Sequence, residues 1–149
     1  MAIKTNASPT ILNCKIYGNK LNGVIVFERG KGIIRNSNIF GNFGLGVQVI
    51  EEANPSFYNC QIYGNEDVGV RISHAGRGLL EGCQVFKNVF SGVEVELQGN
   101  PILNNCKINL NRQYGVWVHS KGTGSFEECD LTGNLGGAWK ISPKCRIQL

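Results

Sequence analysis

Apolar and polar residues recur along this chain with a period of 23 residues. Asparagine marks the period most clearly, because it returns at Asn19, Asn42, Asn65, Asn88, Asn111 and Asn134. A small residue lies five positions earlier, at Cys14, Ser37, Cys60, Cys83, Cys106 and Cys129. Four positions later come Gly23, Gly46, Gly69, Gly92, Gly115 and, in the last copy, Ala138. A fixed period of this length predicts a solenoid in which each repeat stacks on its neighbours.

Within each repeat, apolar residues alternate with polar ones over three short segments. In C-x-I, and again in the G-V-x-V that follows the asparagine, period-two spacing places two side chains on one face of a strand. The inward pairs of the second segment are Val24/Val26, Val47/Val49, Val70/Ile72, Val93/Val95, Val116/Val118 and Trp139/Ile141. A third apolar position holds Ile11, Ile34, Phe57, Leu80, Leu103 and Phe126. Three short strands per coil predict an all-β fold, a right-handed parallel β-helix of six coils.

The leucine-rich repeat is the alternative fold, because a segment such as Ile11-x-x-Cys14-x-Ile16-x-x-Asn19 also fits its template. That template requires an aliphatic residue two positions after the asparagine. This chain has Leu21, Gly44, Asp67, Phe90, Gln113 and Gly136 there. It then continues with a second alternating strand where the leucine-rich repeat needs a helical turn. The pattern therefore favours the β-helix.

The repeats predict one domain over residues 1–149. Its coils are expected at 8–30, 31–53, 54–76, 77–99, 100–122 and 123–145, with end segments at 1–7 and 146–149. The asparagine row is interpreted as structural, because identical stacked side chains can hydrogen-bond to one another along the column and to the backbone groups at a sharp bend. Open solenoid ends expose unpaired backbone groups, so end-to-end self-association is an alternative that the sequence leaves open.

A period of two coils overlies the single repeat. Coils that start with x-Pro (Ser8-Pro9, Asn54-Pro55, Asn100-Pro101) alternate with coils that start with x-Gly (Lys31-Gly32, Arg77-Gly78, Thr123-Gly124). With this two-coil period the chain resembles the β-helical repeats called CASH repeats (carbohydrate-binding and sugar hydrolase), over about residues 8–142. It is most similar to the substrate-binding β-helix of certain F-box proteins of ubiquitin ligases. The matching segments are NPSFYNCQIYGNEDVGVRISHAGRGLLEGCQVFKNVFSGVEV and NPILNNCKINLNRQYGVWVHSKGTGSFEECDLTGN. The resemblance implies a pectate-lyase-like fold and a role in recognition; the F-box itself is absent from the sequence.

The charge and composition limit the classes of partner that this protein is expected to bind. The net charge of +4 comes from scattered Lys and Arg interleaved with Glu, so nucleic acid is not expected as a partner. No apolar window is long enough for a membrane span, and no signal peptide is recognisable. Five of the six cysteines share one repeat position, and Ser37 replaces the thiol in the second coil. This favours reduced, buried thiols over disulfides or zinc ligands, and hence a cytoplasmic location. Cys145, outside the row, is expected to be the one accessible thiol.

The candidate binding surface is the outward face of the G-V-x-V strands. Its central residues are Gln48, Arg71, Glu94, Glu96, Trp117 and His119. Trp117 would supply an aromatic platform and the charges would orient a partner. The alternative is an ordinary exposed face on which Arg71 and Glu94 merely balance charge between strands. A secondary row, Tyr17, Phe40, Tyr63 and Phe86, is either a stack that covers a corner or a sugar- or peptide-binding stripe.

No catalytic residue, metal site or cofactor is expected. Glu94 and Glu96 have the spacing of a carboxylate pair, but equal coil lengths leave no long loops to wall a cleft, and no cluster of acidic calcium ligands is visible. The sequence therefore favours a non-enzymatic scaffold that presents a strand face to a protein or peptide. A carbohydrate-binding or polysaccharide-processing β-helix is the alternative. A structural spacer or self-assembling rod is the third hypothesis.

Overall fold

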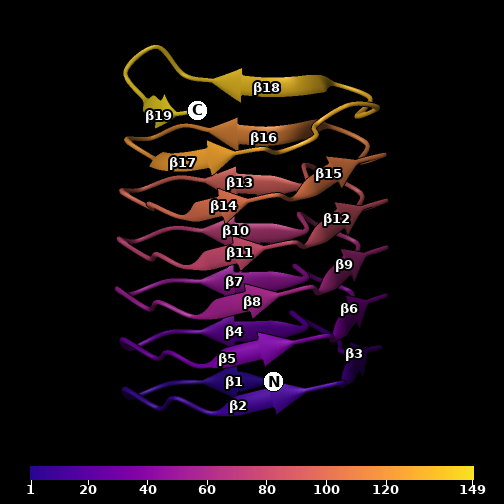
Figure 1. Cartoon of the computed structure of the whole chain (residues 1–149), viewed down its shortest axis with the longest axis vertical. Helices are drawn as coiled ribbons and strands as arrows, with labels where there is room; N and C mark the ends of the chain where they lie inside the picture. Colours follow the sequence, from indigo (N-terminus) through magenta and orange to yellow (C-terminus); the bar gives the residue numbers. More distant parts are fainter.

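In the computed structural model, which describes residues 1–149, parallel strands stack into a right-handed coil with three faces (Figure 1). Sheet A consists of β1 (Ala2–Ile3), β4 (Val24–Val26), β7 (Val47–Val49), β10 (Val70–Ile72), β13 (Val93–Val95), β16 (Tyr114–Val118) and β18 (Gly137–Ile141). Sheet B consists of β2 (Thr10–Leu12), β5 (Ile33–Arg35), β8 (Ser56–Tyr58), β11 (Leu79–Glu81), β14 (Ile102–Asn104), β17 (Thr123–Glu127) and β19 (Arg146–Gln148). Sheet C consists of β3 (Lys15–Tyr17), β6 (Asn38–Phe40), β9 (Gln61–Tyr63), β12 (Gln84–Phe86) and β15 (Lys107–Asn109).

The register of the strands follows the sequence period. Val70 pairs with Val47 on one side and Val93 on the other, so equivalent residues of successive coils stand directly above one another. The segment after each asparagine is a strand of sheet A, not a helical turn, which confirms the β-helix over the leucine-rich repeat. No helix long and apolar enough to cross a membrane is present.

The core is a column of aliphatic side chains between the three sheets. The predicted inward pairs of sheet A are buried from Val24 to Val118, and Ile34, Phe57, Leu80, Leu103 and Phe126 are buried on sheet B. Each coil adds nearly the same layer to the column. Stability in such an array grows with each neighbour-to-neighbour interface rather than from one central core.

The asparagine ladder occupies the corner between sheets C and A. Asn88 Nδ2 donates to Asn111 Oδ1 at 3.0 Å and to the Ile62 carbonyl at 3.3 Å. Its own Oδ1 accepts from the backbone N–H and from Nδ2 of Asn65. The same pattern repeats from coil to coil, and the side chains from Asn42 to Asn134 are buried. The structural interpretation of this row is thereby confirmed.

The cysteine row follows the expected pattern only in the middle of the stack. All six thiols are free, and those of Cys60, Cys83 and Cys106 are buried. Cys14 is exposed, because the first coil has no coil beneath it, whereas Cys145 is half-buried against the core. The expectation that Cys145 would be the one accessible thiol was therefore wrong.

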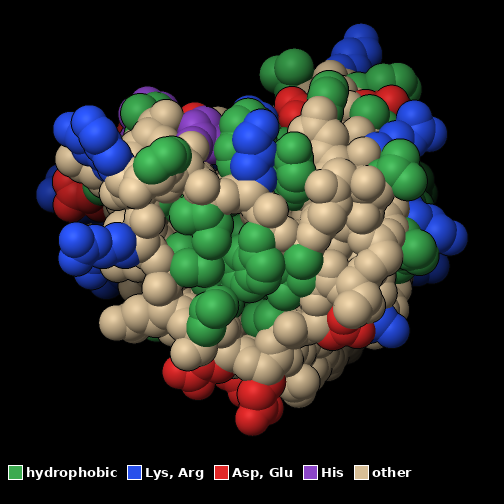
Figure 2. Space-filling model, turned by 90° about the horizontal axis from the view of Figure 1, so that it is seen from above, with side chains coloured by type: hydrophobic (Ala, Val, Ile, Leu, Met, Phe, Trp, Pro, Cys, Tyr) green, Lys and Arg blue, Asp and Glu red, His purple; other side chains and the backbone are tan.

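The sixth coil is less regular than the others. Only an isolated bridge between Lys107 and Asp130 continues sheet C there, because the Asp130 carboxylate accepts hydrogen bonds from the backbone and side chain of Thr132 and forms a turn. Viewed from the C-terminal end, hydrophobic side chains fill the centre of the stack (Figure 2). Trp139 and Ile147 form the last layer of this core, where Trp139 meets Phe126 edge to face.

Candidate functional site

The predicted strip lies on the outward face of sheet A, where the middle residue of each strand points away from the core. Arg71 on β10, Glu94 on β13, Trp117 on β16 and Lys140 on β18 are in direct register. Four successive coils thus present a cation, an anion, an aromatic ring and a cation. The fold brings them together because each occupies the same position of the 23-residue repeat.

Glu94 is buried, with only 5% of its surface exposed, although it lies on the outward face. Arg71 Nε and Nη2 both lie 2.7 Å from Glu94 Oε2. On the opposite side, His119 Nε2 lies 2.8 Å from Glu94 Oε1. The pairing of Arg71 with Glu94 was predicted as the alternative to a binding surface, and the burial of Glu94 was not predicted. The burial arises because side chains from the coils on either side close over the carboxylate.

His119 contacts both carboxylates of the strip, those of Glu94 and Glu96. Its Nε2 is also 3.7 Å from Glu96 Oε2, and its Nδ1 is 2.9 Å from Ser120 Oγ. On the other flank, Asp67 Oδ1 lies 3.6 Å from Arg71 Nη2. Glu94 is therefore the centre of a polar network that spans the coils of Arg71, Glu94 and His119.

Trp117 is half-buried and forms the aromatic part of the cluster. Its ring centroid lies 4.3 Å from that of His119, and Lys140 Nζ lies 4.6 Å from the ring centroid on the next coil. The indole Nε1 is buried and has no hydrogen-bond partner, so packing rather than hydrogen bonding holds the ring. The exposed Lys140 ammonium can be displaced more easily than the histidine.

Gln48 does not join the cluster. It lies one coil below Arg71, in register with it, but its Oε1 accepts a hydrogen bond of 2.8 Å from Asn22 Nδ2. The predicted strip therefore divides into an N-terminal part without charge contacts and a charged, aromatic centre over β10, β13 and β16.

A shallow pocket of about 310 Å³ opens beside this centre. This volume is at the lower end of the range for small-molecule sites, about 300–1,000 Å³. Its lining combines strip residues with residues of the connections that lead into sheet A: Asp67, Val68, Arg71, Phe90, Glu94, Gln113 and Trp117. Asp67, Phe90 and Gln113 were not among the site residues predicted from the sequence. They occupy the variable positions after the asparagine, and that variability was the available signal.

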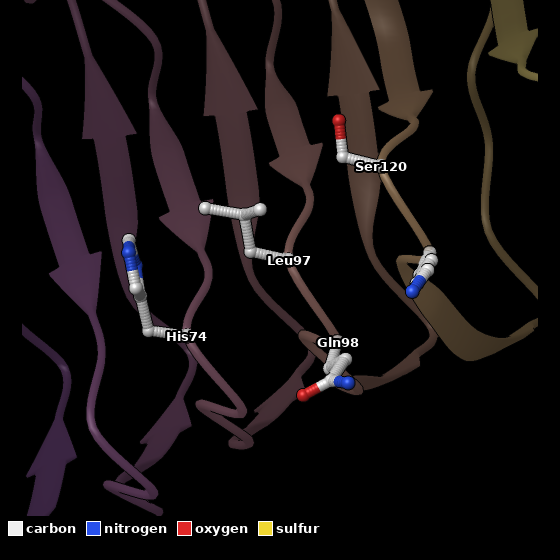
Figure 3. A pocket seen from close by; sticks show the side chains of 5 residues that line it. His74, Leu97, Gln98 and Ser120 are labelled. Carbon is white, nitrogen blue, oxygen red and sulfur yellow. The ribbon is translucent and has the colours of Figure 1, made fainter.

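A second pocket, of about 450 Å³, lies on the turns that follow sheet A (Figure 3). His74, Leu97, Gln98, Ser120 and Lys121 line it. These turn residues have left-handed backbone angles, with φ of 46° at Leu97 and 48° at Ser120. Because Ser120 also contacts His119, the turn pocket adjoins the Glu94 cluster.

The secondary aromatic row lies on sheet C, away from the Glu94 cluster. Tyr17, Phe40, Tyr63 and Phe86 stack with ring centroids 4.9–5.1 Å apart. The rings cover one another, and only Tyr17, at the end of the row, has most of its surface exposed. This geometry accounts for the row as a packed stack; its role in ligand binding stays a prediction.

The chemistry of the cluster suits binding better than acid–base catalysis. A glycosidase needs one carboxylic acid and one free carboxylate on either side of the scissile bond. Here both oxygens of Glu94 are already engaged, and both ring nitrogens of His119 have partners. The cluster offers fixed charges, hydrogen-bonding groups and an aromatic ring, which together can orient a polar ligand.

A family model described as "Right handed beta helix region" matches residues 2–147. The chain belongs to this right-handed β-helix family. No curated protein matches it, and the family match does not distinguish CASH repeats or F-box proteins from other β-helices.

Among solved structures, the chain is similar to a D317A mutant of the periplasmic alginate epimerase AlgG, with a TM-score of 0.75 and 18% identity over 99% of this chain and 41% of that one. It is also similar to the pectate lyase Pel9A, with a TM-score of 0.65 and 14% identity over 97% of this chain and 50% of that one. A third similar structure is the A-module of the mannuronan C-5 epimerase AlgE6 from Azotobacter vinelandii. Its TM-score is 0.66 and its identity is 16%, over 98% of this chain and 55% of that one.

At these identities the likeness shows the fold alone. The chain spans about half the length of these structures. The three proteins are named as an alginate epimerase, a pectate lyase and a mannuronan C-5 epimerase.

Proposed function

We propose that the outward face of sheet A binds a polysaccharide, centred on Glu94. The observation that carries this proposal is the buried Glu94 carboxylate, held between Arg71 and His119 and bordered by Trp117. A fixed polar network next to an aromatic ring is the combination that recognises a sugar, which has hydroxyl groups at its rim and an apolar face.

The shape of the surface supports a polymer rather than a single small molecule. The strands of sheet A repeat at about 4.8 Å, so the strip offers regularly spaced positions along the stack. The two shallow pockets flank the cluster: one lies where the connections enter the strands of sheet A, and the other lies on the turns that follow these strands. The structural neighbours, named for action on alginate, pectate and mannuronan, support the same class of ligand.

The test is titration of the protein with a panel of soluble polysaccharides that includes alginate, pectate and neutral glucans. Trp117→Ala removes the ring beside Glu94, and Tyr63→Ala is the matched control, because it removes a ring from the aromatic row on sheet C. The proposal expects saturable binding that Trp117→Ala weakens at least about tenfold, since loss of an aromatic side chain at the centre of a binding surface costs about 2 kcal/mol or more. Tyr63→Ala should leave the affinity unchanged.

Far-UV circular dichroism of both variants separates loss of binding from loss of fold. Release of reducing ends, followed in the same titrations, distinguishes binding from cleavage. The proposal is wrong if no polysaccharide binds the folded wild-type protein. It is also wrong if Tyr63→Ala abolishes binding while Trp117→Ala does not.

A further inference from the structure

Three potential metal ligands converge on the strip. One carboxylate oxygen each of Glu94 and Glu96 and a ring nitrogen of His119 all lie within 4.8 Å of one another. His119 Nε2 is 2.8 Å from Glu94 Oε1 and 3.7 Å from Glu96 Oε2. Donors bound to one ion by bonds of about 2.1 Å at tetrahedral angles lie about 3.4 Å apart. Small side-chain rotations would therefore bring all three to coordinating separations.

The histidine is oriented as a metal ligand would be. Ser120 Oγ lies 2.9 Å from Nδ1, which leaves Nε2 directed at the two carboxylates. Metal-binding histidines usually have the second ring nitrogen held by a hydrogen bond in this way. A carboxylate oxygen and Nε2 this close are joined either by the hydrogen of a hydrogen bond or by a metal ion that both atoms ligate.

The charges around the histidine also favour a cation. The carboxylates of Asp67 and Glu94 share one guanidinium, that of Arg71, whereas the Glu96 carboxylate lies 3.7 Å from His119 Nε2 and forms no ion pair with a lysine or arginine. Lys140 forms no ion pair with them, because its ammonium lies over the rings of Tyr114 and Trp117. Negative charge therefore exceeds positive charge around a carboxylate that is almost fully buried, and burial makes uncompensated charge costly.

The two oxygens of Glu94 are already divided between different partners. Arg71 occupies Oε2, and Oε1 faces His119. An ion bound to Oε1 would therefore leave the Arg71 pair intact. The imidazole distinguishes this set from calcium and magnesium sites, which are built from oxygen ligands, and favours zinc and its first-row neighbours.

We propose that Glu94, Glu96 and His119 bind one divalent transition-metal ion, with Zn²⁺ as the probe. Three protein ligands leave an open position that can hold water or an oxygen of a bound ligand. From the sequence no metal site was expected: His119 was placed on the same strip as Glu94 and Glu96, but as a binding residue and not as a metal ligand. The proposal does not rest on polysaccharide binding, because metal binding is measured on the protein alone.

The experiment is calorimetric titration of the reduced protein with ZnCl₂, in a Cys14→Ser background that removes the exposed thiol. Binding of one equivalent is expected, and Ca²⁺ should bind more weakly. His119→Ala should lower the Zn²⁺ affinity at least about tenfold, and Ser120→Ala should lower it less, as loss of an orienting partner does. The matched control is His74→Ala, which removes the only other histidine while leaving the cluster untouched.

Glu96→Gln removes one anionic ligand from the edge of the cluster and is a second test if His119→Ala unfolds the protein. Titration with Co²⁺ identifies the ligands, because only thiolate ligation produces an intense sulfur-to-metal charge-transfer band. Binding lost in the His119 or Glu96 variant, kept in His74→Ala and free of this band supports the site. Failure to bind Zn²⁺, binding that survives both ligand variants, or thiolate ligation would overturn it.

Discussion

The corner that holds the asparagine ladder and the outward face of sheet A use the same repeat in opposite ways. At the corner, every coil places the same side chain in the same buried environment, and each asparagine satisfies the next. On the outward face, four successive coils place Arg71, Glu94, Trp117 and Lys140 in register. In both regions the repeat determines where a side chain lies. Only at the corner does packing also determine which amino acid occupies the position. Chemistry specific to one level of the stack can therefore arise only on the outward side.

The largest effect is expected from breaking the ladder in its middle. Asn88→Ala leaves the Nδ2 of Asn65 and the Ile62 carbonyl without their side-chain partners in a buried corner. Each unsatisfied buried group costs about 1–3 kcal/mol, so the free energy of unfolding should fall by about 3–5 kcal/mol. Urea denaturation measures the loss.

Asn19→Ala is the matched control for Asn88→Ala. Asn19 lies half-buried at the start of the ladder, and its side chain only donates to Asn42 Oδ1. The loss should be about 1 kcal/mol. Equal losses at the two positions would contradict the cooperative ladder.

A smaller loss of stability is expected at the glycines that follow each asparagine by four residues, because they lie against the asparagine ladder. A Cβ added at Gly69 would lie 2.6 Å from the Gly92 carbonyl oxygen and 2.7 Å from Asn88 Nδ2. Gly69→Ala should therefore destabilise the protein by about 2–3 kcal/mol, as overpacking does. The last coil already has Ala138 at this position, so Ala138→Gly should change stability by less than about 1 kcal/mol in the same denaturation series. If Gly69→Ala leaves the free energy of unfolding unchanged, the corner can accept an added methyl group, and the packing argument is wrong.

On the outward face, the stability effects should be smaller and should depend on pairing. Arg71→Met leaves the Glu94 carboxylate nearly buried with one partner fewer, and should cost about 1–2 kcal/mol once the partial exposure of Arg71 is taken into account. The double variant Arg71→Met/Glu94→Gln removes the stranded charge and should recover part of that loss. Additive losses in this double-mutant cycle would show that the two side chains act independently.

The smallest perturbation is chemical labelling, which compares the reactivity of the thiols in the middle of the stack with that of the thiol at its N-terminal end. Hydrogen bonds with Cys106 and Cys60, and then burial, raise the pKa of the Cys83 thiol. A raised pKa leaves less of the reactive thiolate at Cys83, and burial shields Cys60 and Cys106 from the reagent. Brief alkylation of the native protein should therefore modify the exposed Cys14 first and leave Cys60, Cys83 and Cys106 unmodified. Mass spectrometry counts the labels, and five or six rapid modifications would contradict the buried row.

The sequence predicts the repeating parts of this structure well. A 23-residue period specifies the register of every sheet, the inward residues and the ladder, because each depends on a position that recurs. It also predicts which residues share the outward face. It does not predict that Glu94 is buried, since this depends on how side chains from three coils fold over one another. The exposure of Cys14 and the turn at Asp130 are effects of the ends, where a period carries no information about a missing neighbour.

The most direct test of the outward strip is a crystal structure of the protein with an oligosaccharide of the polymer that binds most tightly in the titrations. The proposed function predicts sugar residues lying along sheet A, in contact with Trp117 and with the polar network around Glu94. Sugar bound along the aromatic row that contains Tyr63, or at an open end of the stack, with the outward face of sheet A left bare, would contradict it.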